Sequence, residues 1–217
     1  MDAAGNAALL ARQPHTVEML RAIGIMPILT VDSIAQAREQ AEALMRGGLR
    51  GLELTLRTPV ALDAIRELKR AYPELRLGAG TVLSAEQLRA AADAGADFIV
   101  TPGTTPALRE ALAATPLPVV PGASTPSEML ELSELGFRVA KLFPAAALGG
   151  MTMLKALQGP LAEFQFCPTG GLGEADAATY LALPNVACIG GSWMLTGDAA
   201  EISTRAARCR ALVDARR

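Results

Sequence analysis

The stretch GLELTLRTPVALDAIRELKRAYPELRLGA, residues 51–79, contains a complete strand–helix–strand unit. Leucine alternates with other residues over 51–56, which indicates a β-strand. Residues 59–72 read as an amphipathic helix, and a second strand follows at 75–79. Two strands joined through a helix favour a βα repeat and a parallel sheet.

The same alternation runs in both directions along the chain. It predicts strands at residues 25–30, 51–56, 75–79, 98–100, 118–120, 138–143, 164–167 and 186–189. It predicts helices at about 15–23, 32–46, 59–72 and 199–213, with Gly47-Gly48 ending the second and Ser84 capping the helix after the third strand. Eight strands, each followed by a helix or a helix-length segment, predict an α/β fold, a (β/α)8 or TIM barrel with an extra N-terminal helix. An open doubly wound sheet fits less well, because no Gly-x-Gly-x-x-Gly follows the first strand.

Length and composition limit the function classes. We expect a single barrel domain over residues 1–217, with 1–14 as an N-terminal extension, because no linker is visible. The chain is 51% hydrophobic and 19% charged with a net charge of −2. The absence of a basic run argues against nucleic acid as a partner. No apolar run reaches the roughly 18 residues of a membrane span, and the N-terminus lacks a signal-peptide pattern, so we expect a cytoplasmic protein.

Cysteine and histidine usage narrows the chemistry further. Cys167, Cys188 and Cys209 form no Cys-x-x-Cys pair, which argues against a disulfide framework and favours reduced, buried thiols for the first two. The single histidine, His15, precedes every predicted strand, so neither a zinc site nor a histidine-based triad is expected. We expect no metal and no cofactor.

Lys141 is the first candidate for catalysis. It is one of three lysines and lies inside Val-Ala-Lys-Leu-Phe, near the end of a predicted strand, whereas Lys69 and Lys155 lie in helical stretches. Since side chains alternate along a strand, Lys141 shares the barrel-facing side with Val139 and Phe143. Removing water from an ammonium group favours the neutral amine, which can attack a carbonyl. A structural ion pair and a phosphate-binding lysine are the alternatives.

Residues 52–57, Leu-Glu-Leu-Thr-Leu-Arg, place three leucines on one face and Glu53, Thr55 and Arg57 on the other. A carboxylate inside a barrel is unfavourable unless it is paired or catalytic. Glu53 could move the protons that Schiff-base aldol chemistry requires, and Arg57 at the rim could bind a substrate carboxylate through two hydrogen bonds. The alternative is a Glu53–Lys141 ion pair with a solvated Arg57.

Two glycine pairs follow the last two predicted strands, at Thr169-Gly170-Gly171 and Gly190-Gly191-Ser192. The loops after the final strands of a barrel commonly bind phosphate, because glycine lets backbone N–H groups approach an anion. Tight turns without a ligand are the alternative reading.

Taken together, these segments resemble the aldolases of 2-keto-3-deoxy-6-phosphogluconate (KDPG), which also act on 4-hydroxy-2-oxoglutarate (KHG). The resemblance covers about residues 15–215. It rests on LELTLRT (52–58), GAGTVL (78–83), TPG (101–103), PGASTPSE (121–128), KLFPA (141–145), FCPTGG (166–171) and CIGGSW (188–193).

The resemblance implies a class I aldolase, a lyase of the Entner–Doudoroff pathway that reversibly cleaves KDPG to pyruvate and glyceraldehyde 3-phosphate. It implies Lys141 as the Schiff-base lysine and Glu53 as the general acid and base. It also implies a homotrimer, a small phosphorylated keto acid as ligand, and the absence of a metal. The implied substrate-binding residues are Arg57 and Thr81 at the carboxylate, Pro102 and Phe143 in the pocket wall, and Thr169, Gly170, Gly171, Gly191 and Ser192 at the phosphate.

One segment departs from the family pattern. Residues 145–148 read Ala-Ala-Ala-Leu, where many relatives carry a glutamate, so Ala146 could alter the polar end of the pocket. Three other functions remain as alternatives: the aldolase of the galactonate epimer, whose members tend to have asparagine at the position of Arg57; a barrel sugar-phosphate epimerase or synthase; and a non-catalytic phosphosugar-binding barrel.

Overall fold

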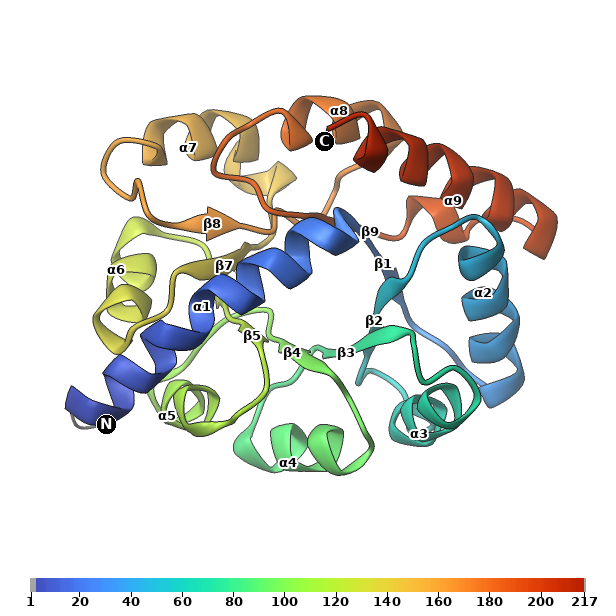
Figure 1. Ribbon diagram of the computed structural model, residues 1–217, viewed down its shortest axis with the longest axis horizontal. Helices are drawn as coiled ribbons and strands as arrows, with labels where there is room; N and C mark the ends of the chain where they lie inside the picture. Colours follow the sequence, from blue (N-terminus) through green and yellow to red (C-terminus); the bar gives the residue numbers. More distant parts are fainter. Residues whose placement is uncertain (1–2, 217) are drawn as a thin grey trace.

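Parallel strands with helices packed outside them form the α/β architecture of the computed structural model, which describes residues 3–216 (Figure 1). Six strands pair in the order β5-β4-β3-β2-β1-β9 and three more in the order β6-β7-β8. The strands are β1 (Ile25–Leu29), β2 (Gly51–Thr55), β3 (Arg76–Gly80), β4 (Phe98–Val100), β5 (Val119–Val120), β6 (Gly122–Ala123), β7 (Val139–Leu142), β8 (Gln165–Phe166) and β9 (Ile189–Gly191).

Most of the helices follow a strand and cover the outside of the sheets, whereas α1 runs across the near side of the molecule in Figure 1. The helices are α1 (Ala3–Ile23), α2 (Ile34–Arg46), α3 (Ala61–Ala71), α4 (Ala85–Asp93), α5 (Pro106–Ala114), α6 (Pro126–Leu135), α7 (Gly150–Leu157), α8 (Glu174–Leu181) and α9 (Ala199–Asp214), with short 3-10 turns η1 (Ala146–Leu148) and η2 (Trp193–Leu195). Ser33 caps α2, and Ser84 caps α4 as predicted. Within residues 3–216, no helix is long and apolar enough to cross a bilayer.

The two sheets meet at both of their edges. Only Pro121 separates β5 from β6, and its carbonyl accepts a hydrogen bond from the backbone of Lys141. On the other side, single parallel bridges join Phe166 to Val186 and Thr169 to Gly190. Backbone pairing therefore continues from each sheet to the next.

Because side chains alternate between the two faces of each strand, the buried residues form two layers. Ala140, Leu142, Leu52 and Leu54 belong to the layer between strands and helices, which confirms the predicted outward face of β7 and β2. A second group, the inner cluster, lies between the strands and α1 and consists of Met19, Leu20, Ile23, Met26, Phe98, Val100, Val120, Val139, Cys167, Ala187 and Cys188. Residues on the inward face beyond this cluster therefore lie at the carboxyl ends of the strands.

The first helix was predicted too short. It was expected at 15–23, but α1 begins at Ala3 and includes most of the proposed extension 1–14, of which residues 1 and 2 lie outside the described part. Tertiary contacts hold this half in place: the buried Gln13 accepts from the backbone N–H of Arg138, and Arg12 donates to the carbonyl of Thr115 at 2.6 Å. Pro14 is accommodated inside the helix.

The last strand was predicted three residues too early. Residues 186–189 were expected, but β9 covers Ile189–Gly191, and Gly190 and Gly191 pair with Met26 and Pro27 of β1. These glycines therefore lie in a strand, and the prediction of a glycine turn at 190–191 is wrong. Close approach explains them, since a Cβ on Gly191 would lie 2.0 Å from the ring of Trp193.

Candidate active site

A buried ion pair forms the centre of the site. Nζ of Lys141, on β7, lies 3.2 Å from Oε1 of Glu53, on β2. Glu53 is 0% exposed and Lys141 4%, so neither charge is screened by bulk water. The second carboxylate oxygen, Oε2, is buried without a hydrogen-bond partner among the described residues. The pair thus joins an amine to a carboxylate that still has acceptor capacity.

Gly80 makes room for the carboxylate. It ends β3, opposite Thr55 in the β2–β3 register, and a Cβ there would lie 2.0 Å from Oε1 of Glu53. Such a contact is far inside van der Waals distance, so any larger residue would move the carboxylate. Only glycine allows the glutamate to lie at its observed position.

The variant Gly80→Ala is therefore expected to lose about 100-fold in kcat, because a displacement of about 1 Å at a reacting group can have that effect. Its stability should fall by only about 1–3 kcal/mol, the usual effect of overpacking. Steady-state kinetics and urea unfolding measure both. Gly159→Ala is the matched control, since a Cβ there meets no atom within 4 Å; equal kcat values for the two variants would contradict this role of Gly80.

Arg57 and Thr81 lie side by side beyond the ends of β2 and β3. Nε of the exposed Arg57 donates to Oγ1 of Thr81 at 3.1 Å. Thr81 has a φ of 56°, the one positive φ at a non-glycine residue within 3–216. A left-handed conformation is unfavourable for a β-branched residue and is typical of functional sites. The backbone thus holds the Thr81 hydroxyl against the guanidinium.

Phe143 connects the lysine with the glycine turn. Its ring centroid lies 5.4 Å from Nζ of Lys141, and its peptide bond to Pro144 is cis. A Cβ on Gly170 would lie 3.1 Å from the ring. Pro102 packs against Gly122, the neighbour of Lys141 in the β6–β7 register. Lys141, Phe143, Pro102 and Gly170 therefore belong to one contiguous set of contacts.

The turn after β8 agrees with the prediction in its backbone. Gly170 and Gly171 have φ values of 97° and 74°, which are accessible to glycine. Thr169 is buried, its hydroxyl donates to the carbonyl of Cys167 at 3.3 Å, and its side chain lies against Gly190. Ser192, just beyond β9, is exposed. The structure thus joins Thr169 to the last strand and leaves the exposed Ser192 available to solvent.

Two comparisons identify the family. A family model described as "KDPG and KHG aldolase" matches residues 16–208. The KHG/KDPG aldolase of Escherichia coli K12 is 45% identical over 177 residues, which are 82% of this chain and 83% of that protein. The chain belongs to the KDPG and KHG aldolase family. Membership confirms the predicted enzyme class, an aldolase and hence a lyase, and does not favour the alternative functions.

Solved aldolases of the family share the architecture. The KDPG aldolase of Zymomonas mobilis ZM4, determined with 3-phosphoglycerate, superposes with a TM-score of 0.88 at 38% identity over 92% of this chain and 97% of that one. The KDPG aldolase of Legionella pneumophila, with pyruvate captured as a covalent carbinolamine, gives 0.83 at 38% identity over the same shares. A carbinolamine is the adduct that a nucleophilic amine forms with a ketone.

Two further residues of this aldolase were not predicted as part of the site. Gly80 lies within the motif GAGTVL, but the motif did not predict its role, which depends on Glu53 in the neighbouring strand. Oγ of Ser124 donates to the carbonyl of Phe143 at 2.7 Å, and Glu128 accepts from the backbone N–H of Ser124. Ser124 lies within PGASTPSE, so the motif marked the segment without revealing the contact.

The three cysteines of the aldolase are free and buried. Burial raises the pKa of the Cys209 thiol to about 11 and that of Cys188 well above its usual value. These two thiols therefore stay protonated at neutral pH and are poor nucleophiles.

Proposed function

We propose that this aldolase cleaves KDPG reversibly to pyruvate and glyceraldehyde 3-phosphate through a Schiff base on Lys141, and that KHG, cleaved to pyruvate and glyoxylate, is a further substrate. The observation that carries the proposal is the buried contact of 3.2 Å between Nζ of Lys141 and Oε1 of Glu53. An amine stripped of water beside a proton acceptor has the arrangement that imine formation requires. Trapping of the imine formed with pyruvate by borohydride, followed by mass spectrometry of the peptides, tests it.

The reaction would run as follows on these side chains. Glu53 takes a proton from the ammonium of Lys141, and the neutral amine attacks C2 of the keto acid to give a carbinolamine. Glu53 gives that proton to the carbinolamine hydroxyl, which leaves as water and yields an iminium ion. Glu53 then removes the proton of the C4 hydroxyl, the C3–C4 bond breaks, and its electron pair moves into the iminium to give an enamine. Glu53 returns the proton to C3, and hydrolysis releases pyruvate and the free lysine.

Arg57 and Thr81 would bind the carboxylate of the keto acid. A guanidinium forms two parallel hydrogen bonds with a carboxylate, and the strained Thr81 presents its hydroxyl beside it. The two groups lie at the rim, beyond the strand that carries Glu53, where the C1 carboxylate of a ketone bound to Lys141 would extend. Phe143 and Pro102 would line the pocket wall between them and the phosphate end.

The variant Arg57→Ala is expected to raise KM for pyruvate about 10- to 100-fold in the condensation direction, with little change in kcat, because a charge-assisted hydrogen bond contributes about 1.5–3 kcal/mol to binding. Arg66→Ala, on the exposed face of α3, is the matched control. An unchanged KM for pyruvate would rule out this role of Arg57.

The phosphate would bind at the carboxyl ends of β8 and β9. Gly170 and Gly171 form a turn of positive φ whose backbone N–H groups could bind an anion, and the exposed Ser192 offers a hydroxyl beside Gly191. Thr169 would contribute through its position between the two strands, since its hydroxyl already donates to Cys167. The Zymomonas relative with 3-phosphoglycerate supports a phosphorylated ligand for the family.

We further propose that the strands close into one (β/α)8 barrel and that residues 1–217 form a single domain. Two observations support closure. Parallel bridges join the segment of β8 to the segment of β9, and a single residue separates β5 from β6.

The free, buried cysteines support a reducing compartment such as the cytoplasm. A homotrimer is proposed as well: Leu83 and Leu130 are more than half exposed, which an interface would cover, and light scattering after size exclusion tests it.

A further inference from the structure

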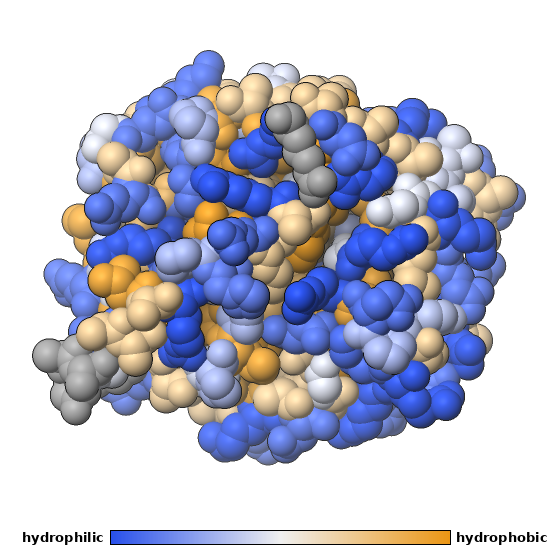
Figure 2. Space-filling model, viewed as in Figure 1, coloured by the Kyte–Doolittle hydropathy of each residue, from blue (hydrophilic) through white to orange (hydrophobic). Residues whose placement is uncertain are grey.

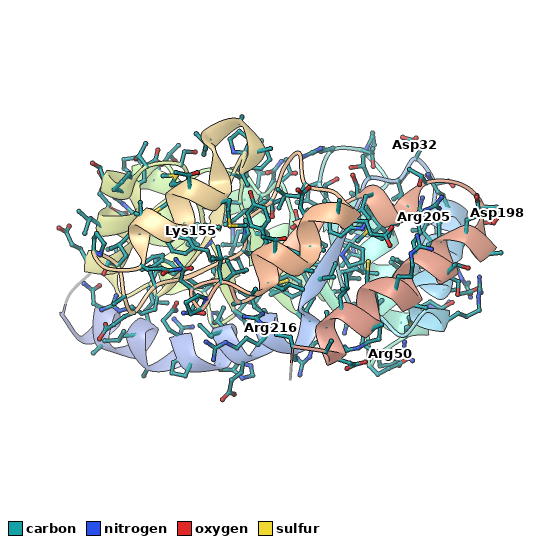
Figure 3. The ribbon with its side chains drawn as sticks, turned by 90° about the horizontal axis from the view of Figure 1, so that it is seen from above. Asp32, Arg50, Lys155, Asp198, Arg205 and Arg216 are labelled. Carbon is teal, nitrogen blue, oxygen red and sulfur yellow. The ribbon has the colours of Figure 1, made fainter. Side chains whose placement is uncertain are left out.

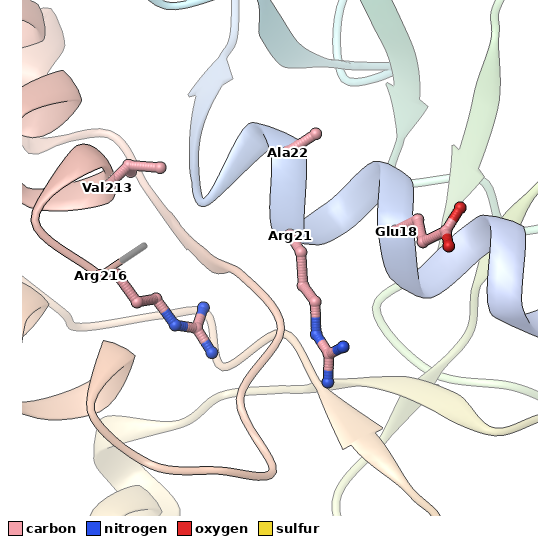
Figure 4. Close-up of a pocket in the computed structure, with 5 residues that line it drawn as sticks. All are labelled: Glu18, Arg21, Ala22, Val213 and Arg216. Atoms are coloured by element: carbon pink, nitrogen blue, oxygen red, sulfur yellow. The ribbon is translucent and has the colours of Figure 1, made fainter.

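The end of the molecule opposite Lys141 contains two adjoining cavities. The first, of about 360 Å³, is lined by Glu18, Arg21, Ala22, Val213 and Arg216 (Figure 4). Its arginines bond to residues that begin or precede strands, since Arg21 donates to Gln165 at the start of β8, and Arg216 to the carbonyls of Val186 and Ala187 before β9. Lys141 and Arg57, in contrast, lie at or beyond strand ends. The cavity is therefore separate from the proposed active site.

Two guanidinium groups share this cavity, and the one carboxylate among its lining residues, that of Glu18, is directed away from them. In Figure 4 the side chains of Arg21 and Arg216 extend into the same space between α1 and the end of the chain, whereas Glu18 points the other way along α1. Neither arginine forms an ion pair within the described residues. Burial, and then the charge of Arg21, lower the pKa of Arg216. A bound anion would offset the repulsion between the two guanidinium groups.

The hydrogen bonds that do form hold the two groups in place. Arg21 donates to Oε1 of Gln165 at 3.2 Å, and Arg216 donates to the carbonyl of Ala187 at 3.1 Å and also to that of Val186. A guanidinium has five N–H donors, so each group keeps donors beyond those used in these hydrogen bonds. The arginines are thus positioned before any ligand arrives.

The second cavity, of about 270 Å³, continues the basic surface. It shares Glu18 and Ala22 with the first and adds His15, Arg50 and Arg76. Figure 2 views this face and shows hydrophilic side chains over much of it, with hydrophobic ones between them, and Figure 3 shows Arg50 and Arg216 on the side of α1, away from Asp32. Four arginines against one glutamate is a local excess of positive charge in a chain of net charge −2.

We infer that these two cavities bind a small molecule carrying a phosphate group, held by Arg21 and Arg216. The planar forks of two guanidinium groups match the oxygens of a phosphate dianion, which also neutralises their repulsion. The adjoining cavity with Arg50 and Arg76 accommodates the remainder of an anionic metabolite. Because Arg21 lies on α1 and Arg216 near the end of the chain, the bound anion would also link these two segments. Leu20 and Ile23 of α1 belong to the inner cluster, so this link would stabilise the packing of α1.

Equilibrium dialysis with labelled inorganic phosphate at fixed ionic strength tests this inference. Wild-type protein is expected to bind phosphate at this site about tenfold more tightly than the variant Arg21→Gln, a difference that corresponds to one charge-assisted hydrogen bond. If the variant loses the site altogether, the wild type binds one more phosphate per chain. Arg66→Gln removes the same charge from an exposed face of α3 and should bind like the wild type. Arg21→Gln should keep the wild-type kcat and KM for KDPG cleavage.

Two results would overturn the inference: an unchanged phosphate isotherm in Arg21→Gln, or equal losses in Arg21→Gln and Arg66→Gln, which would indicate net charge alone. Failure of the proposed aldolase activity is a separate outcome, because it appears in the wild-type kinetics and leaves the difference between the isotherms unaffected.

Discussion

The variant Lys141→Met is expected to lose aldol cleavage by about four orders of magnitude or more, because it removes the nucleophile on which every later step depends. Methionine has a similar length and suits a site that is 4% exposed. The cleavage rate is measured by coupling pyruvate release to lactate dehydrogenase. Binding of a phosphorylated ligand at the turn after β8 should persist, since that turn does not contain the lysine.

The loss must be separated from misfolding. Removing Lys141 leaves Glu53 buried without its partner, which can destabilise the fold by about 3–5 kcal/mol when the carboxylate stays charged. Circular dichroism and urea unfolding therefore accompany the kinetics. Lys155→Met is the matched control, because Lys155 is exposed on α7. A folded Lys141→Met protein with a rate near that of the control would disprove the role of Lys141.

Replacing Glu53 with glutamine should lower kcat about 10²- to 10⁴-fold, the usual contribution of a general acid and base. Glutamine preserves shape and the hydrogen bond to Nζ but cannot carry the protons that the C4 hydroxyl and C3 exchange. The enzyme should also stop exchanging the methyl protons of pyruvate with deuterium oxide, which proton NMR follows directly. The imine itself should still form on long incubation.

This second readout distinguishes catalysis from a structural ion pair. A glutamate that merely neutralised Lys141 would affect stability and imine formation but would not be the base for methyl exchange. Glu110→Gln, an exposed residue of α5, provides the control. Exchange at the control rate in Glu53→Gln would assign the proton transfer to another group.

Periodicity predicted which side chains of the strands face away from the helices, because each strand has one face toward the helices and one away from them. Leucines at 52 and 54 occupy the layer beneath the helices, so Glu53 had to face inward, and the same reasoning placed Lys141 opposite Ala140 and Leu142. Alternation determines which face of a strand a residue occupies, but it contains no distances. The pairing of Glu53 with Lys141, 88 residues apart, was predicted only as an alternative, and its distance required coordinates.

The errors have a common physical origin in tertiary contacts. Arg12 and Gln13 hold the first half of α1 in place through hydrogen bonds to residues more than 100 positions away. Local helix propensity contains no information on such contacts. Gly190 and Gly191 looked like a turn because glycine usually marks one, whereas here small size permits close packing within β9. Gly80 escaped notice for the same reason, since its function depends on a side chain in the adjacent strand.

The central claim concerns the nitrogen of Lys141. The most direct measurement incubates the wild-type aldolase with pyruvate and sodium borohydride, digests it and identifies the modified peptide by mass spectrometry. We predict one reduced pyruvyl adduct per chain, located on Lys141. Full recovery of unmodified Lys141, or an adduct confined to Lys69 or Lys155, would contradict the account.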